Sequence, residues 1–327
     1  MKRSSVLSGI MALLFLLAMI FDSRTALSGA ADGVQLCVAT VIPSLFPFFV
    51  VSILLTGLLS SCTKGKHTLL LVGFLGGYPV GAQCVAQAYQ SGRISRQEAE
   101  RMLCFCNNAG PAFLFGIGSS LLPEVWMCWL LWLIHILSAL LVAALTPKSQ
   151  FSASPTLFPS PVSLTAAMQR AVRSMGLVCG WIILFRTVIG FCQRWFLWLL
   201  PSNCQLLVMG LLEMTNGCCA LTEIASVGLR FELFGLFLGF GGLCVLLQTK
   251  SVLSGSRLNG CHYFPGKVAQ AAFSFLLCVV AQLLLPAQMR YYPWAGFSLL
   301  AVTACMGYGI YWAKIKNHSS IPAEFGV

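Results

Sequence analysis

The sequence has few charged residues, and acidic ones are rarest of all. Charged residues make up 9% of its 327 positions, with 9 Asp or Glu against 20 Lys or Arg. A soluble domain carries about 25% charged residues. The chain is instead 58% hydrophobic, with a mean hydropathy of +0.85. This composition excludes an ordinary soluble protein and predicts an all-α polytopic integral membrane protein.

The sequence also lacks the usual spacings of metal-binding and catalytic residues. It has 15 cysteines and 4 histidines but no CxxC pair and no HExxH motif. Most cysteines lie singly inside apolar runs, where cysteine acts as a small hydrophobic residue. No Ser/His/Asp grouping and no paired aspartates occur within one span. We therefore expect no enzyme activity, no metal site and no cofactor.

The excess of basic residues gives a net charge of +11, which can indicate nucleic-acid binding. Here, however, Lys and Arg form short clusters between apolar runs, as they do in loops on the cytoplasmic side of a membrane. We expect contact with membrane lipids and a small-molecule substrate, and no nucleic acid. The sequence leaves homo-oligomer formation open.

Apolar runs of about 20 residues, long enough to span a bilayer, occur at six places. They cover residues 6–22, 36–60, 125–146, 176–200, 267–286 and 293–313. Two further apolar regions, 69–122 and 204–249, are punctuated by glycine, proline and asparagine. Between the halves, the Pro/Ser-rich stretch 147–165 predicts an irregular linker. The basic segment Ala166–Ser174 after it predicts a short interfacial helix.

The most informative feature is a pair of interrupted apolar segments in each half of the chain. The interruptions are Gly76–Ala82 and Asn107–Pro111 in the first half, and Glu213–Gly217 and Gly239–Gly242 in the second. Lipid cannot satisfy the backbone groups that such breaks expose, so protein or a polar cavity must do so. Matching breaks in two halves point to a transporter's substrate site. The alternative is that they are only tight turns and close helix contacts.

The order of a span, a hairpin, a helix, a break and a second span occurs twice. We therefore divide the chain into five parts. These are an N-terminal transmembrane helix and outer loop (1–35), a first repeat (36–146), a cytoplasmic linker with the interfacial helix (147–175), a second repeat (176–286), and a last transmembrane helix with a cytoplasmic tail (287–327).

Basic residues decide the predicted topology, because cytoplasmic loops are rich in Lys and Arg. Lys2 and Arg3 place the N-terminus in the cytoplasm, and the C-terminal tail falls on the same side. The other basic residues assigned to the cytoplasmic side include Lys64, Lys66, Lys148, Lys250, Arg257 and Lys267. Hairpins at about 69–90 and 206–225 then enter from opposite faces, which is the arrangement of an inverted repeat with re-entrant hairpins and broken helices.

The polar residues near the breaks are the candidate substrate ligands. They are Tyr78, Gln83, Asn107, Asn108, Asn216 and Gln248. Their side chains suit carboxylates, amides and ring nitrogens, and the N-termini of half-helices attract anions. Four aromatic residues at or near the breaks have rings that could stack on a planar ligand. They belong to Tyr78, Phe105, Phe113 and Phe240.

Two ionisable residues at membrane depth are interpreted as coupling or structural charges, because a charge there is costly and usually marks a pathway or a pair. They are Glu213 and Arg186, and whether they pair is left open. A proton-coupling role for Glu213 is a hypothesis.

The segment Ser95–Glu98 is a capping box, which predicts the start of a helix. The charges of that helix at Glu100 and Arg101 are expected to be solvated.

Three first-half strings carry a family resemblance: Gly73–Ala82, Gly92–Arg101 and Phe105–Pro111. They resemble the sporulation integral membrane proteins of the YlbJ (SpoVV) type, which carry the nucleoside-recognition, or Gate, domain. Glu213–Gly217 and Gly239–Leu243 are similar to that family's second-half motifs. The resemblance covers most of the chain. It implies a fold similar to concentrative nucleoside transporters and a location in a bacterial cell membrane.

For function, the resemblance implies movement of dipicolinic acid across the outer forespore membrane of spore-forming Firmicutes. Dipicolinic acid is a planar pyridine with two carboxylates, which the polar and aromatic residues at the breaks would suit. Three hypotheses follow. They are a sporulation-linked transporter of dipicolinate or a similar small planar anion, a nucleoside/cation symporter, and a non-transporting membrane scaffold in sporulation.

Overall fold

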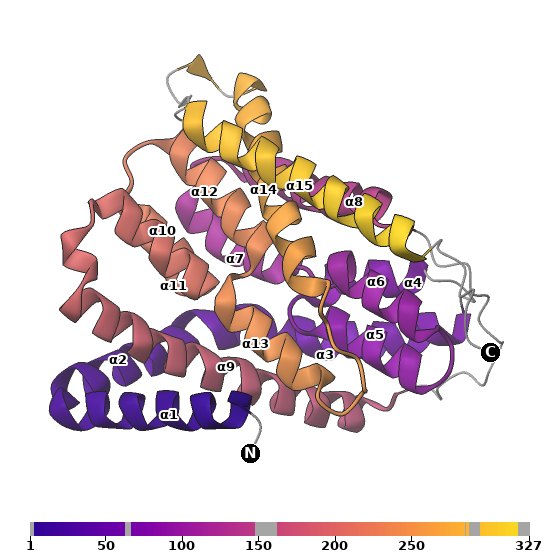
Figure 1. Cartoon of the computed structure of the whole chain (residues 1–327), viewed down its shortest axis with the longest axis horizontal. Coiled ribbons are helices and arrows are strands. Elements are labelled where there is room, and N and C mark those ends of the chain that lie inside the picture. Colours follow the sequence, from indigo (N-terminus) through magenta and orange to yellow (C-terminus); the bar gives the residue numbers. More distant parts are fainter. Residues whose placement is uncertain (1–2, 63–66, 148–161, 285, 288–294, 320–327) are drawn as a thin grey trace.

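The protein is helical throughout the part that its structure describes. The computed structural model describes residues 3–62, 67–147, 162–284, 286–287 and 295–319 (Figure 1). Within these ranges there are α-helices, short 3₁₀-helices and one π-helical turn, and no strand. The predicted all-α polytopic class is therefore confirmed. Most of the predicted linker and the C-terminal tail lie outside the described residues, as do Lys2, Lys64, Lys66 and Lys148.

In the described part of the first half there are four long or moderately long helices and four short ones. Its elements are α1 (Arg3–Phe21), α2 (Ser23–Leu36), the π-helical turn Cys37–Val41, α3 (Ile42–Cys62), α4 (His67–Gly76), α5 (Val80–Gln90), α6 (Arg96–Cys106), α7 (Pro111–Leu121) and α8 (Val125–Leu145). An α-helix rises about 1.5 Å per residue, so the short helices α4 to α7 reach only about halfway across a bilayer.

The second half also combines long helices with short ones. Its elements are α9 (Leu164–Trp195), α10 (Ser202–Leu212), α11 (Met214–Ala220), α12 (Val227–Phe240), α13 (Gly242–Leu253), α14 (Tyr263–Ala281) and α15 (Ala295–Ser319), with 3₁₀ turns at Leu197–Leu199, Leu221–Glu223 and Gln282–Leu284. The series α3 to α8 and the series α9 to α14 have the same order: a long helix, a helical hairpin, two helices separated by a break, and a long helix. All four predicted breaks interrupt helices.

Five helical stretches among the described residues are long and apolar enough to cross a membrane. They are Ser23–Leu55, Val125–Leu145, Leu164–Trp195, Val227–Leu253 and Tyr263–Leu284. The predicted interfacial helix Ala166–Ser174 is wrong as a separate element, because α9 runs through it without interruption. Ser163 caps the start of α9 by accepting the backbone N–H of Ala166. No proline follows within α9, so the helix continues into the span.

The long helices form two groups with the broken helices between them (Figure 1). On one side α2 and α3 pack along α9, and on the other α12, α8 and α15 pack around α14. The short helices α4 to α7, α10, α11 and α13 lie between these groups. The breaks are therefore surrounded by protein, as backbone groups without partners require in lipid.

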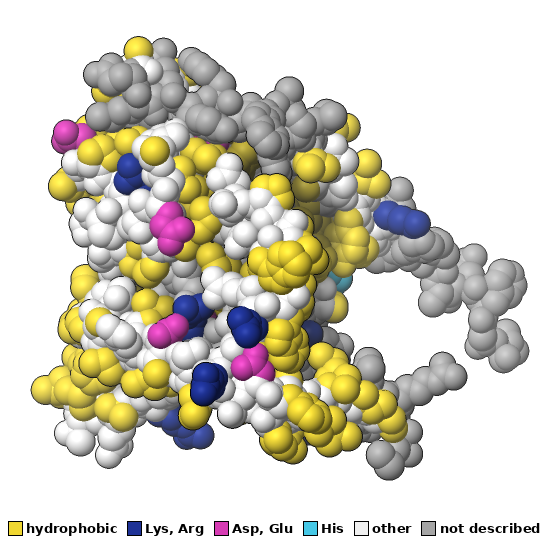
Figure 2. Space-filling view, turned by 90° about the vertical axis from the view of Figure 1, so that its left-hand side faces the viewer, with side chains coloured by type: hydrophobic (Ala, Val, Ile, Leu, Met, Phe, Trp, Pro, Cys, Tyr) yellow, Lys and Arg dark blue, Asp and Glu magenta, His cyan; other side chains and the backbone are white. Residues whose placement is uncertain are grey.

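The outer surface has the apolar character expected in lipid. On α8 one helical face is buried, while Trp129, Leu133 and Leu137 of another face are exposed. Figure 2 shows one side of the molecule, where hydrophobic side chains cover much of the surface and a few Lys, Arg, Asp and Glu side chains interrupt them. Contiguous exposed apolar surface of this kind marks contact with membrane or partner.

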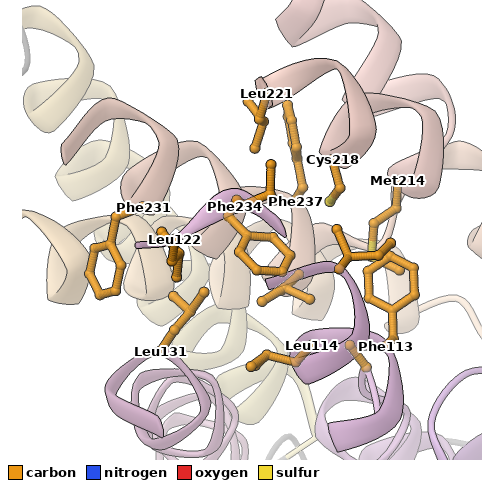
Figure 3. Close-up of a cluster of buried hydrophobic side chains, with 14 of the residues drawn as sticks. Phe113, Leu114, Leu122, Leu131, Met214, Cys218, Leu221, Phe231, Phe234 and Phe237 are labelled. Atoms are coloured by element: carbon orange, nitrogen blue, oxygen red, sulfur yellow. The ribbon is translucent and has the colours of Figure 1, made fainter. Parts of the chain in front are cut away.

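One buried hydrophobic cluster joins the two halves (Figure 3). It includes Phe113 and Leu114 of α7, Leu131 of α8, Met214 and Cys218 of α11, and Phe231, Phe234 and Phe237 of α12. The three phenylalanines of α12 are fully buried. In a membrane, helices associate through van der Waals packing and interhelical hydrogen bonds, so this close packing of α12 against α7 and α8 helps to hold the two halves together.

Candidate functional site

The four breaks meet in the middle of the molecule. In the first half the backbones of Gly77 and Gly110 touch, so that a Cβ on Gly110 would lie 3.1 Å from the Cα of Gly77. In the second half a Cβ on Gly242 would lie 3.1 Å from the backbone nitrogen of Met214. Gly241 and Gly242 have φ values of 80° and 81°. Such positive values are readily adopted only by glycine.

Tyr78 connects the breaks of the two halves. Its ring lies against Gly241, where an added Cβ would be 3.1 Å from Cζ of the tyrosine. Its hydroxyl donates a hydrogen bond to the carbonyl oxygen of Leu238 over 3.1 Å. That carbonyl belongs to the last turn of α12, whose final carbonyl groups have no partner within the helix. Tyr78, a residue of the first half, therefore caps the C-terminal end of α12 in the second half.

Asn107 ties three other elements to the first-half break. Its side-chain oxygen accepts the backbone N–H of Ala82 on α5 over 3.3 Å. Its side-chain nitrogen donates to Thr249 Oγ1 on α13 over 2.9 Å and to the Tyr263 hydroxyl on α14 over 2.8 Å. The residue is completely buried. All of its side-chain hydrogen-bonding groups are thus used inside the protein.

Asn108 is also fully buried and internally bonded. Its amide nitrogen donates to the carbonyl oxygen of Phe105 over 2.7 Å, and its amide oxygen accepts from Gln270 Nε2 over 2.8 Å. Neither asparagine lies in the wall of the pocket described below. Both therefore hold the break in shape from behind that wall.

Lys267 is a site residue that the sequence analysis missed. It was assigned to a cytoplasmic loop, but its side chain is completely buried on α14. Its Nζ donates to the carbonyl oxygen of Asn107 over 3.1 Å and to Gln270 Oε1 over 2.7 Å, and lies 5.0 Å from the centre of the Tyr78 ring. The predicted span 267–286 begins at Lys267, which made the residue look like one that flanks the membrane, whereas α14 begins at Tyr263 and contains Lys267 in its second turn. An ionisable residue within a transmembrane helix marks a functional site by default.

Glu213 occupies the break between α10 and α11 and is buried. One carboxylate oxygen accepts the backbone N–H of Thr215 over 2.9 Å. The other accepts the backbone N–H of Asn216 over 2.7 Å and its side-chain amide over 2.6 Å. The carboxylate therefore caps its own short helix. The start of α5 is occupied in the same way by Asn107, so these two helix ends attract internal acceptors rather than a free anion.

A pocket opens where the breaks converge. Its wall includes Tyr78 and Gly110 from the first-half breaks and Glu213 and Thr215 from the third break. Gln248 on α13 and the ring of Phe113 on α7 complete the part of the wall that could recognise a ligand. Both halves thus contribute polar groups and both line the same space.

The predicted ligands separate into two groups. Tyr78 and Gln248 lie in the pocket wall together with Glu213, while Asn216 lies outside that wall and donates its side-chain amide to Glu213. Gln83 faces α9, where its amide nitrogen donates to Ser174 Oγ over 3.4 Å. Among the predicted aromatic residues, Tyr78 and Phe113 line the pocket. Phe105 lies beneath Arg101 and Phe240 packs against Phe264.

Glu213 and Arg186, whose pairing the sequence left open, have different partners in the structure. Arg186 Nη2 lies 2.8 Å from Asp32 Oδ2, and its other terminal nitrogen donates to Gln193. This ion pair joins α9 to α2, with the Asp32 side chain 50% exposed. Glu213 meets backbone and amide N–H groups instead. The two charges therefore serve different parts of the molecule.

Ser95 caps the start of α6 as the predicted capping box requires, since its Oγ accepts the backbone N–H of Glu98 over 3.1 Å, while the Glu98 carboxylate pairs with Arg101. The expected solvation of the following charges is wrong. The carboxylate of Glu100 is buried and accepts the backbone N–H groups of Asn259 and Gly260 over 2.6 and 2.9 Å. Arg101 donates to the carbonyl oxygen of Ala143 over 3.2 Å. These charges hold the α13–α14 loop and α8 against α6, a role that sequence spacing does not show.

A comparison with known proteins now supports the sequence resemblance. The chain is 26% identical over 322 residues to the sporulation integral membrane protein YlbJ of Bacillus subtilis (strain 168). The similarity covers 80% of this chain and 79% of that protein. The predicted resemblance to YlbJ is confirmed. No family model and no solved structure matches the chain, so the likeness to YlbJ rests on sequence.

Proposed function

We propose that this protein is a membrane transporter that binds a small planar carboxylate, first of all dipicolinic acid, in the pocket between its broken helices. The observation that carries the proposal is that breaks from both halves line one pocket. Irregular backbone at membrane depth is tolerated where it is buried in protein or lines a cavity, and substrate sites of secondary transporters are built in this way.

The chemistry of the pocket supports a planar ligand with acceptor groups. The rings of Tyr78 and Phe113 supply flat apolar surface. The Gln248 amide and the Thr215 hydroxyl supply hydrogen-bond donors. Lys267 places a positive charge against the Tyr78 ring, which forms part of the wall. This charge would favour an anion, while the three N–H groups on Glu213 reduce the repulsion from its carboxylate.

From the likeness to YlbJ we further propose that this transport serves sporulation and that the protein lies in the outer forespore membrane. We further propose that the two series of helices are an inverted repeat, with the hairpins α4–α5 and α10–α11 entering from opposite faces and both termini in the cytoplasm. The matched order of elements supports the repeat, and the clusters of basic residues support the orientation. The Gate-domain architecture is part of the same proposal.

A second candidate is a nucleoside/cation symporter, and one observation favours it. Glu213 places a carboxylate in the pocket wall, and a carboxylate is a good acceptor for sugar hydroxyl groups. A nucleoside would combine such hydroxyls with a planar base that stacks on Tyr78 or Phe113. The two candidates therefore differ in whether the pocket binds an anion or a neutral polyol.

Uptake by purified protein in proteoliposomes tests the proposal. Labelled dipicolinate and labelled uridine are compared for the wild type, for Gln248→Ala and for the control Gln87→Ala, whose side chain is exposed on α5. We expect dipicolinate uptake by the wild type and the control. A hydrogen bond to a charged group is worth about 1.5–3 kcal/mol, so Gln248→Ala should weaken apparent affinity roughly 10- to 100-fold.

The alternatives give different results. Uridine uptake without dipicolinate uptake would favour the nucleoside symporter. No uptake of either compound by correctly inserted wild-type protein would overturn dipicolinate as substrate and favour the scaffold hypothesis. A scaffold would also retain its role in spore formation when the pocket residue Gln248 is replaced.

A further inference from the structure

The surroundings of Lys267 resemble the coordination shell of a metal cation. The ammonium group has two oxygen neighbours, the backbone carbonyl of Asn107 at 3.1 Å and the side-chain carbonyl of Gln270 at 2.7 Å. The third neighbour is the Tyr78 ring, whose centre is 5.0 Å away. Carbonyl oxygens are ligands of hard cations, and aromatic faces attract cations of either kind.

The position of these oxygens strengthens the comparison. Asn107 follows the last residue of α6, where helical carbonyl groups lack partners and the helix dipole is negative. In transporters with broken helices, the unwound carbonyls and the C-terminal ends of half-helices coordinate the coupling sodium ion. Here the same kind of backbone site receives the end of a lysine side chain.

The charge of Lys267 is not balanced by an acidic neighbour. Among the described residues no carboxylate lies within ion-pair distance of its Nζ. The ion pairs of that part of the chain are Arg101–Glu98 and Arg186–Asp32, and neither involves Lys267. A buried ammonium normally requires pairing because its transfer from water is costly. At this position the groups available to stabilise a charge are two carbonyl dipoles and the Tyr78 ring, the same kinds of group that hold a bound ion.

We propose that Lys267 is a tethered cation that takes the place of a coupling ion at the second break, so that the protein works without sodium. For transport, this inference rests on the proposed function; the statement about cation binding stands apart from it. Removing the ammonium group should leave a vacant site formed by the Asn107 carbonyl, the Gln270 amide oxygen and the Tyr78 ring. A small monovalent cation could then bind there.

Thermal unfolding of detergent-solubilised protein tests the cation site without any assay of transport. The wild type, Lys267→Ala and the control Lys250→Ala, whose lysine is exposed near the end of α13, are each measured in sodium, methylammonium and choline chloride at equal ionic strength. We expect sodium or methylammonium to raise the Tm of Lys267→Ala by about 3 °C or more relative to choline. The wild type and the control should show no such difference.

Two results would overturn the inference. One is a folded, monodisperse Lys267→Ala protein whose Tm is the same in all three salts. The other is wild-type protein that sodium stabilises or whose uptake sodium drives. If Lys267→Ala does not fold, the wild-type measurements decide: equal Tm and equal dipicolinate uptake in sodium and choline support the inference. Because the Tm readout needs no substrate, failure of the transport proposal would remain distinguishable.

Discussion

Gln270 on α14 donates a hydrogen bond to the side-chain oxygen of Asn108 over 2.8 Å, although 162 positions separate the two residues. The neighbouring Lys267 bonds the carbonyl of Asn107, and Tyr263 accepts from the Asn107 side chain. One face of a second-half helix therefore supports the second break of the first half. A substitution on that face should therefore alter the pocket, although α14 contributes no residue to the pocket wall.

The first prediction concerns the stability of this junction. Replacing Asn107 by alanine should lower the free energy of unfolding by about 2–4 kcal/mol, because several buried groups would lose a partner at about 1–3 kcal/mol each. These are the Ala82 N–H, the Thr249 hydroxyl and the Tyr263 hydroxyl. Thermal unfolding in detergent measures the effect, with the exposed Gln87→Ala as the control. Equal Tm values for the two variants would contradict a supporting role for Asn107.

The second prediction concerns the close approach of α5 to the end of α6. A Cβ on Gly81 would lie 2.1 Å from the carbonyl oxygen of Cys106, which is backbone and cannot move aside cheaply. Gly81→Ala should therefore give little folded protein. Gly180→Ala is a matched control, because nothing lies within 4 Å of the position its Cβ would take. Size-exclusion profiles of the two variants check this, and a monodisperse Gly81→Ala protein would show that the contact is not tight.

The breaks could be predicted from the sequence because they depend on local chemistry. Glycine, proline and asparagine interrupt helices for reasons that lie in the residues themselves, so Gly77, Asn107 and Gly241 were placed correctly at breaks. The capping box at Ser95 is equally local, since its hydrogen bond joins residues three apart. Composition alone sufficed for the membrane class, as the exposed apolar faces confirm.

The remaining features depend on contacts between distant residues, which periodicity does not reveal. Arg186 has Asp32 as its partner at a separation of 154 positions, and Glu100 meets the backbone of Asn259 at a separation of 159. Lys267 was misplaced for a different reason. Basic residues near the end of an apolar run usually flank the membrane, and this one lies a single turn inside helix α14. Burial, not spacing, distinguishes the two cases.

The third prediction separates the two ionisable residues that the sequence placed together. Arg186→Ala should change the free energy of unfolding by only about 0.2–1 kcal/mol, the usual value for an exposed ion pair. Its partner Asp32 is largely exposed, and neither residue lines the pocket. Substrate uptake should therefore be unchanged. A large loss of uptake in well-folded Arg186→Ala protein would mean that the α2–α9 contact moves during transport.

The last prediction concerns Glu213, whose carboxylate both caps α11 and lines the pocket. In Glu213→Gln one acceptor oxygen becomes an NH₂ group, which cannot accept the Asn216 N–H. Loss of such a cap costs about 1–2 kcal/mol, so the Tm should fall. If Glu213 also carries the coupled proton, uptake by this variant should no longer depend on pH, because the amide does not titrate.

A pH series of initial uptake rates for the wild type, Glu213→Gln and the control Glu223→Gln, whose side chain is exposed, separates the two roles. A lower Tm with unchanged pH dependence would leave Glu213 as a structural cap and remove it from coupling. Loss of the pH dependence in Glu213→Gln alone would assign it the proton. That outcome would fit the buried Lys267, because a protein whose cation site is already filled by its own side chain must draw its driving force from another ion or from the substrate gradient.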